Sequence, residues 1–242
     1  MRRSLRRQLR FLHAYAIGTS LALVAVATAA FEQQRPTSAN LDEVTVQRMN
    51  VVDKNGTLRL VIAGKDRMHP GVLDGRTLER ERPVAGLIFF NDEGDEVGGL
   101  TYTGRLANGQ RNADSGIMFD QLKQDQTIGI HYTEVNGRRI AALEVWDRSE
   151  RPLGELIDKL NAANRIADPV AREAAVRAVR GEAPPAPRRV FVGKNEDGAA
   201  TVSLADGNGK PRLTLTVDAS GNPRIESLDA DGKVLQQWPP TR

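Results

Sequence analysis

The chain has 242 residues, of which 40% are hydrophobic, 5% aromatic and 27% charged, and it contains no cysteine. This length suffices for one large domain or two small ones. The lack of cysteine excludes disulfides, thiolate metal sites, iron–sulfur clusters and a cysteine nucleophile. Five of the 34 basic residues lie within residues 1–10, which leaves 29 basic against 31 acidic residues over 11–242. The body is therefore nearly neutral, and nucleic acid is not an expected partner.

The N-terminal segment has the pattern of a membrane-targeting or export signal. Arginines crowd residues 1–10, and the stretch 11–31 then carries no charged residue apart from His13. Because about twenty apolar helical residues span a bilayer, this stretch predicts a transmembrane helix, with the lipid bilayer as its partner. The positive-inside rule then predicts a single-pass protein of a bacterial inner membrane with an extracytoplasmic body. Ala27-Thr28-Ala29 supports the alternative, a cleaved signal and a secreted or periplasmic body.

A recurring tetrapeptide organises the rest of the chain. After a polar spacer over 32–42, an acidic or amide residue, two variable residues and a glycine return throughout the predicted β domain (43–148) and the C-terminal part (188–238). Such a glycine supplies the positive φ that closes a type I turn with a bulge. The predicted structural turn residues are Gly56, Gly94, Gly137, Gly198, Gly209, Gly221 and Gly232.

The segments between these turns alternate apolar and polar residues. Period-two sets such as Leu58, Leu60 and Ile62 predict antiparallel strands with one buried face. The same pattern recurs at Ile128, Ile130 and Tyr132, and at Leu213, Leu215 and Val217. The predicted fold is mainly β, a meander of hairpins that forms a sandwich or an open barrel. Gly98 and Gly99, inside a predicted strand, indicate a bulge or a close approach of two backbones.

A helical connector is predicted at about 151–181, within a linking region at 149–187. Apolar residues from Leu153 to Ile166 follow helical spacing, and a second helix begins with Asp168 as N-cap and ends near Gly181. The C-terminal part then shows turns every 11 or 12 residues, which predicts a repeat of one strand and one turn. The predicted strands cover residues 189–194, 200–205, 212–217, 224–228 and 233–237.

Several phrases within the first β block resemble a known family. They are GLIFFNDEG at 86–94, GGL at 98–100, FDQ at 119–121 and QDQ at 124–126. Over about residues 45–147 the chain resembles a family of uncharacterised bacterial proteins that are exported or membrane-anchored and rich in β structure. The resemblance implies export and a β fold. It brings no known activity, no catalytic residue and no cofactor.

Acidic side chains near two predicted turns are the best candidates for chemistry. Asp92, Asp95, Asp120 and Asp125, with Glu93 and Glu96 beside them, are weak candidates for a Ca²⁺ site, since this ion takes six to eight oxygen ligands. A pair of these carboxylates would also suit glycoside hydrolysis. The favoured interpretation is ordinary turn chemistry, in which Asp120 and Asp125 cap their loop through hydrogen bonds to the backbone.

The remaining candidates have simpler interpretations. His131 shares the predicted polar face with Thr127 and Thr133, and His69 lies in a loop without a paired ligand motif. The aromatic residues of the strands are interpreted as core, with sugar stacking as the alternative. The arginines over 172–189 are interpreted as a solvated helical face.

The preferred functional prediction is a non-enzymatic, membrane-tethered extracytoplasmic protein that binds or scaffolds an envelope protein or glycan. The alternatives are an envelope polysaccharide hydrolase and a calcium-dependent binding module. In both alternatives the clustered carboxylates act directly, as catalytic groups or as calcium ligands, whereas the preferred prediction gives them a structural role. Two carboxylates that face each other across a cleft would favour the enzyme.

Overall fold

The computed structural model describes residues 2–33 and 38–240, which fall into two units, Met1–Thr45 and Val46–Arg242. The first unit contains helix α1 (Arg2–Gln33). Within the described residues, no helix is both long enough and apolar enough to cross a membrane. The predicted transmembrane helix is therefore wrong. Polar residues interrupt its apolar stretch: Thr19 Oγ1, for example, donates hydrogen bonds to the carbonyls of Tyr15 (2.9 Å) and Ala16 (3.0 Å).

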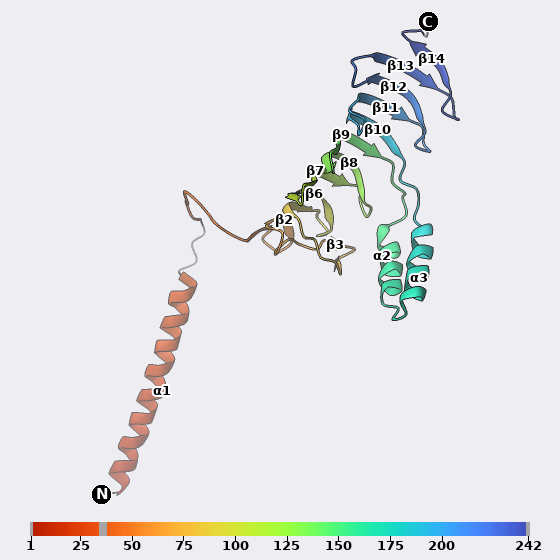
Figure 1. Ribbon diagram of the computed structural model, residues 1–242. Coiled ribbons are helices and arrows are strands. Elements are labelled where there is room, and N and C mark those ends of the chain that lie inside the picture. The colour runs from red at the N-terminus through yellow and green to blue at the C-terminus, as the bar shows by residue number, and fades with distance from the viewer. Residues whose placement is uncertain (1, 34–37, 241–242) are drawn as a thin grey trace. The chain divides into compact units, whose positions relative to one another are not determined.

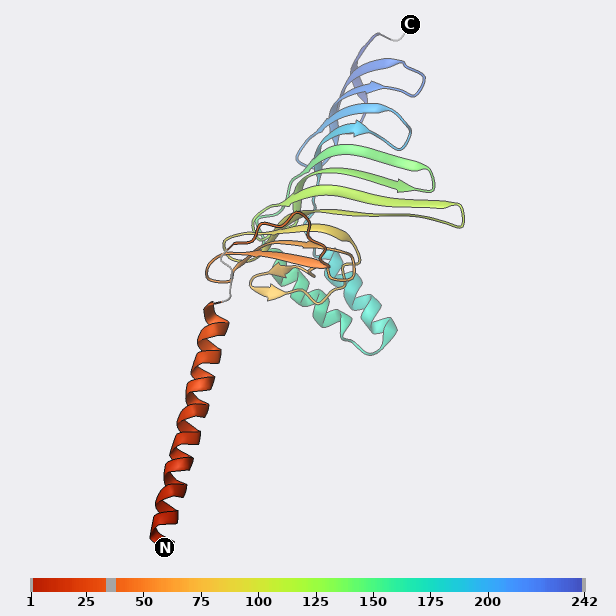
Figure 2. The same cartoon turned by 90° about the vertical axis from the view of Figure 1, so that its left-hand side faces the viewer.

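The second unit is built on one antiparallel sheet of twelve strands. Their order in the sheet follows the chain, as Figures 1 and 2 show, with β1 and β14 at the two edges. The strands are β1 (Arg48–Val52), β2 (Leu58–Ala63), β5 (Ala85–Phe90), β6 (Glu96–Ala107), β7 (Gln110–Asp120), β8 (Gln126–Val135), β9 (Arg138–Trp146), β10 (Arg188–Lys194), β11 (Ala200–Ala205), β12 (Pro211–Val217), β13 (Pro223–Leu228) and β14 (Val234–Trp238).

The predicted sandwich or barrel is wrong, because both β blocks belong to this one open sheet. The two blocks join where β10 pairs with β9, with Val190 opposite Val145 and Val192 opposite Leu143. The chain leaves the sheet after β9 and returns to the neighbouring position. It does not start a second layer.

The hairpin turns close through glycines in the left-handed backbone conformation, as predicted. The seven turn glycines have φ values between 78° and 91°. At one such turn, Asp218 Oδ1 accepts hydrogen bonds from the backbone N–H groups of Ser220 and Asn222, both at 2.9 Å. The acidic side chain thus satisfies the turn backbone, and the glycine supplies the conformation that other residues disfavour.

Gly98 serves a different purpose within β6. Its φ is +129°, and a Cβ placed there would lie 2.2 Å from the carbonyl oxygen of Met118 on β7. A register shift in the β5–β6 pairing, between Phe89 and Phe90, marks an irregularity beside it. The backbone of β7 therefore approaches too closely for any side chain at this position.

We expect Gly98→Ala to destabilise the fold by at least about 2 kcal/mol, because the added methyl group meets backbone that cannot rotate away. Gly104→Ala on the same strand is the matched control, since its Cβ would lie 3.6 Å from Ala113 Cβ, an ordinary contact. Urea denaturation of both variants measures the difference. Equal midpoints for the two variants would contradict the close approach at Gly98.

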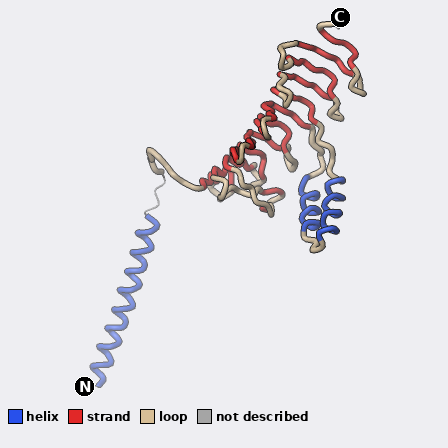
Figure 3. The backbone as a smooth tube through the Cα atoms, viewed as in Figure 1, coloured by secondary structure: helices blue, strands red, loops and turns tan. Residues whose placement is uncertain are grey.

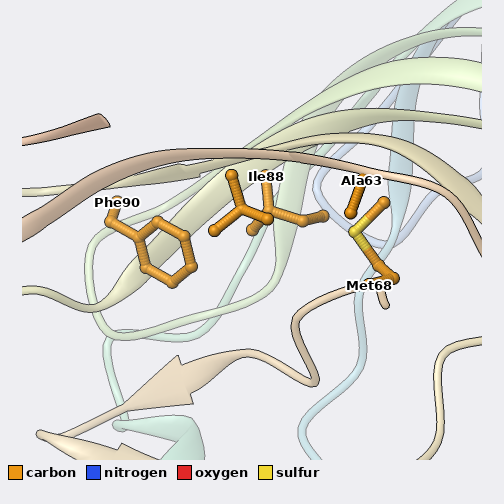
Figure 4. Close-up of a cluster of buried hydrophobic side chains, with 5 residues drawn as sticks. Ala63, Met68, Ile88 and Phe90 are labelled. Carbon is orange, nitrogen blue, oxygen red and sulfur yellow. The ribbon is translucent and has the colours of Figure 1, made fainter. Parts of the chain in front are cut away.

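The main hydrophobic core lies under the first strands of the sheet. Val61 and Ile88 are 0% and 1% exposed, and Met68 reaches them from the loop after β2. Figure 4 shows Ala63, Met68, Ile88 and Phe90 packed together beneath the sheet. The loop that carries Met68 continues into a small hairpin, β3 (Val72–Leu73) and β4 (Arg76–Thr77). This segment covers one face of β2 and β5.

Two helices form the connector between β9 and β10 (Figure 3). They are α2 (Leu153–Asn164) and α3 (Pro169–Gly181). The Asp168 side chain accepts a hydrogen bond from the Ala171 N–H (2.7 Å), which caps α3. Arg76 on β4 pairs with Asp158 on α2 (2.7 Å), so this helix pair is tied to the small hairpin.

Candidate functional site: carboxylate cluster and apolar face

Lys123 contacts two of the predicted acidic residues, Glu93 and Asp95, and a third carboxylate that was not predicted, Asp74. It lies in the β7–β8 turn with φ of 60°. Its Nζ is 2.7 Å from Asp95 Oδ2, 2.5 Å from Glu93 Oε2 and 3.3 Å from Asp74 Oδ1. Three carboxylates thus converge on a cation, as expected for a calcium site, but the cation is an ammonium group of the protein itself.

Asp95 is the buried member of this cluster, with 1% of its surface exposed. Burial alone would raise its pKa, but hydrogen bonds from the Gly75 N–H (2.9 Å) and from Lys123 outweigh burial and lower the pKa below its usual value. The hydrogen bond from Lys123 to Asp95, and then those to Glu93 and Asp74, raise the pKa of Lys123. Both groups therefore remain charged and paired at neutral pH.

The other acidic residues of the β5–β6 turn point elsewhere. Asp92 is exposed and pairs with Arg59 (2.7 Å), and Arg82 Nη2 donates to both carboxylate oxygens of Glu96 (2.7 and 3.0 Å). The structure therefore does not bring Asp92 and Asp95 to a common ligand. Over residues 2–33 and 38–240, no three acidic or histidine side chains are arranged to hold a metal ion.

Asp120 has the most unusual environment of the predicted acidic residues. Its Oδ1 is buried and has no hydrogen-bond partner among the described residues, so the predicted cap is wrong at this oxygen. Burial raises its pKa to about 7, with smaller contributions from the nearby charges of Glu96 and Asp125. A small cavity of about 110 Å³ is lined by these three carboxylates and by Arg80. Asp125 itself lies 4.0 Å from Arg148.

Two glutamines, not the aspartates, fasten the β7–β8 loop to the connector. Gln121 Nε2 donates to the Ser149 carbonyl (3.2 Å), and Gln124 Nε2 donates to the Arg151 carbonyl (2.7 Å). The Leu153 N–H at the start of α2 donates to the Lys123 carbonyl (2.9 Å). Sequence reasoning expected the polar side chains of this loop to bond neighbouring backbone, and it missed Lys123 and the contact of both amides with the connector. Their signal was the lack of glycine in a polar loop that carries one central cation.

The histidines have structural partners. His131 Nε2 lies 2.8 Å from Glu144 Oε2, and Glu144 is 6% exposed and also pairs with Arg188. His131 therefore has a hydrogen-bond partner on the polar face, as predicted, but its side chain is less exposed than a surface position implies, at 13%. His69 Nδ1 accepts the Gly71 N–H (3.0 Å), and burial, aided by nearby arginines, lowers the pKa of His69.

The clearest surface feature is a row of apolar residues that crosses the whole sheet. Residues directly opposite each other in antiparallel strands share one face. The register places one apolar residue from each of the twelve strands in a single line. This central apolar row consists of Met49, Ile62, Leu87, Leu100, Ile117, Ile130, Leu143, Val192, Val202, Leu215, Ile225 and Trp238.

A second row lies beside it on the same face. It consists of Val51, Leu60, Phe89, Phe119, Ile128, Val145, Val190, Leu204 and Leu213, with Gly98 between Phe89 and Phe119. The central row and this flanking row define what we call the apolar face. Neither row contains a charged side chain.

The apolar face is exposed, which corrects the prediction that the alternating strands bury it. Ile130 is 57% exposed and Trp238 60%. Phe119 is 48% exposed, so the expectation that the aromatic residues of the strands form a core is wrong at this position. Phe90, on the opposite face, is 5% exposed. Two open hollows of about 580 and 520 Å³ lie along the central row, around Ile130 and around Leu215.

No family model matches this chain, and no curated protein matches it at a significant level. The functional argument therefore rests on the geometry of the carboxylate cluster and the apolar face.

Proposed function

We propose that this protein is a non-enzymatic binding or scaffold protein and that its apolar face is the binding surface. One observation carries the proposal: an uncharged row of apolar side chains extends over all twelve strands and remains largely exposed. Soluble proteins rarely expose a continuous apolar patch larger than a few hundred Å², and larger patches mark interaction sites. The composition of the face suits another apolar protein surface better than a glycan.

The geometry of the carboxylates supports a binding role over hydrolysis. Glu93 and Asp95 are held by Lys123, and Glu96 is held by Arg82. The cavity at Asp120 measures about 110 Å³, whereas ligand sites usually measure about 300–1,000 Å³. The cluster instead joins the β3–β4 hairpin, two sheet turns and helix α2.

Export of the body is part of the proposal. Its support is the arginine-rich segment 1–10, the charge-poor stretch after it and the signal-peptidase pattern Ala27-Thr28-Ala29. In this form of the proposal the N-terminal segment is cleaved, and the body works in the periplasm or outside the cell. The N-terminal sequence of protein recovered from the periplasmic fraction tests this placement.

The apolar face is tested with Nile red, an uncharged dye that fluoresces on apolar surfaces, at submicromolar protein. We expect Leu215→Lys and Ile130→Lys each to lose a large part of the dye fluorescence, because each places a charge in one of the two hollows. Thr214→Lys is the matched control, since Thr214 is also next to Leu215 on β12, points to the opposite face and does not line the hollow. Helix α1 is present in every variant, so its contribution cancels. Equal fluorescence in all four proteins would refute the proposed binding surface.

A further inference from the structure

We infer that the occupant of the apolar face is a second copy of this chain, packed face to face. The inference rests on the proposed function, because it names the partner of that same surface. It starts from the architecture. A β-sheet with one apolar face reaches a stable arrangement when a second layer covers that face. Within the second unit, Val46–Arg242, the described residues supply cover on the opposite face, through the segment that carries Met68 and the β3–β4 hairpin.

The size of the face matches what a stable dimer needs. Twelve strands at about 4.8 Å spacing extend over roughly 55 Å, and a stripe two rows wide measures about 14 Å along the strands. The stripe thus covers roughly 700–800 Å², close to the ~800 Å² that each partner buries in a standard protein interface. A small apolar ligand would fill one hollow and leave the rest of the row in water.

The composition of the face favours a copy of itself. In a two-fold interface the same patch meets itself, so any charge in it would oppose an identical charge nearby. The central and flanking rows contain none. Two sheets of the same twist can stack with their strands about 30° apart, as in β-sandwiches, so that both apolar faces interdigitate at about 10 Å.

The exposed aromatic side chains supply the anchors that such an interface uses. Trp238 lies in the central row at one edge of the sheet, and Phe119 lies in the flanking row near its middle, stacked on Phe89 at 6.0 Å. Aromatic residues are enriched among the side chains that contribute most of the binding free energy of interfaces. Their exposure in the single chain therefore has a physical use in the dimer.

Sedimentation equilibrium of the full chain, from about one to one hundred micromolar, tests the inference. We expect the parent to reach twice the mass of one chain, and Leu215→Lys and Ile130→Lys to raise the dimer dissociation constant at least about tenfold, since each buries an unpaired charge. Thr214→Lys should dimerise as the parent does. Far-ultraviolet circular dichroism checks that each variant retains its β structure.

The outcomes separate this inference from the proposed function. A parent that remains monomeric over the whole range overturns the second copy, while the dye measurement still decides whether the face binds apolar ligands. A dimer that persists unchanged in both lysine variants also overturns it, because association would then use another surface such as the free edges of β1 and β14. Loss of the dimer in Thr214→Lys as well as in Leu215→Lys also overturns the inference, because the contact would then not be specific to the apolar face.

Discussion

Asp120→Asn should stabilise the protein at pH 8 and have little effect near pH 4. The pKa of Asp120 is about 7 in the folded protein, against an ordinary value of 3.8. Between these values the folded chain holds a proton that the unfolded chain has released, so stability falls as the pH rises through this window. Above pH 7 the ionised, buried carboxylate costs on the order of 4 kcal/mol. Asparagine has the same shape and cannot ionise.

The measurement is a series of urea denaturation curves at pH 4.5, 6, 7 and 8 for both proteins. We expect the difference in unfolding free energy to grow in favour of Asp120→Asn as the pH rises. Asp231→Asn, at an exposed turn, controls for the amide substitution itself. A loss of stability in Asp120→Asn that is the same at every pH would show instead that the carboxylate accepts hydrogen bonds from its loop.

Lys123→Met should produce the largest loss of stability among single substitutions in the cluster. The substitution keeps the length of the side chain but leaves Asp95, which is 1% exposed, with backbone partners only. Removal of one partner from a buried ion pair leaves an uncompensated charge, and we expect the melting temperature to fall by about 5–15 °C. Thermal unfolding followed by circular dichroism at pH 7 measures the change.

A double variant that also changes Asp95 tests whether the buried charge causes this loss. In Lys123→Met, the further change Asp95→Asn should restore part of the lost stability, because the buried charge is then absent. The pKa of Asp95 is lowered in the folded state, so its contribution is complete above pH 3.8 and disappears as the pH falls through the folded pKa. The gap between parent and Lys123→Met should therefore narrow in acid. Lys54→Met, in an exposed turn, is the control. A gap that persists unchanged below pH 3 would exclude the ion pair as its cause.

Features that depend on neighbouring residues could be predicted from the sequence. The strand predicted at 200–205 coincides with β11, and that at 212–217 differs from β12 by one residue. Asp168 caps α3 through the Ala171 N–H. Alternation and turn chemistry act over a few residues, so their signals are present in any short window of the chain.

Features that depend on distant segments required the tertiary structure. The sequence of the loop over 120–126 predicts an acidic turn. In the structure, its Lys123 forms ion pairs with Asp74, Glu93 and Asp95, which other turns carry. The isolation of Asp120 Oδ1 likewise depends on packing around it. No local pattern records which cation reaches which carboxylate, because that choice depends on how separate hairpins meet.

The apolar face shows the same division between local and tertiary information. The alternation of residues such as Leu213 and Leu215 determined that each strand has an apolar side, and this follows from the two-residue period of a strand. Whether that side is buried depends on where the chain goes after β9. The pairing of Val190 with Val145 adds β10 to the same sheet, so the second β block lengthens the first and does not cover it. Tertiary pairing, through this one register, left the apolar side of twelve strands open.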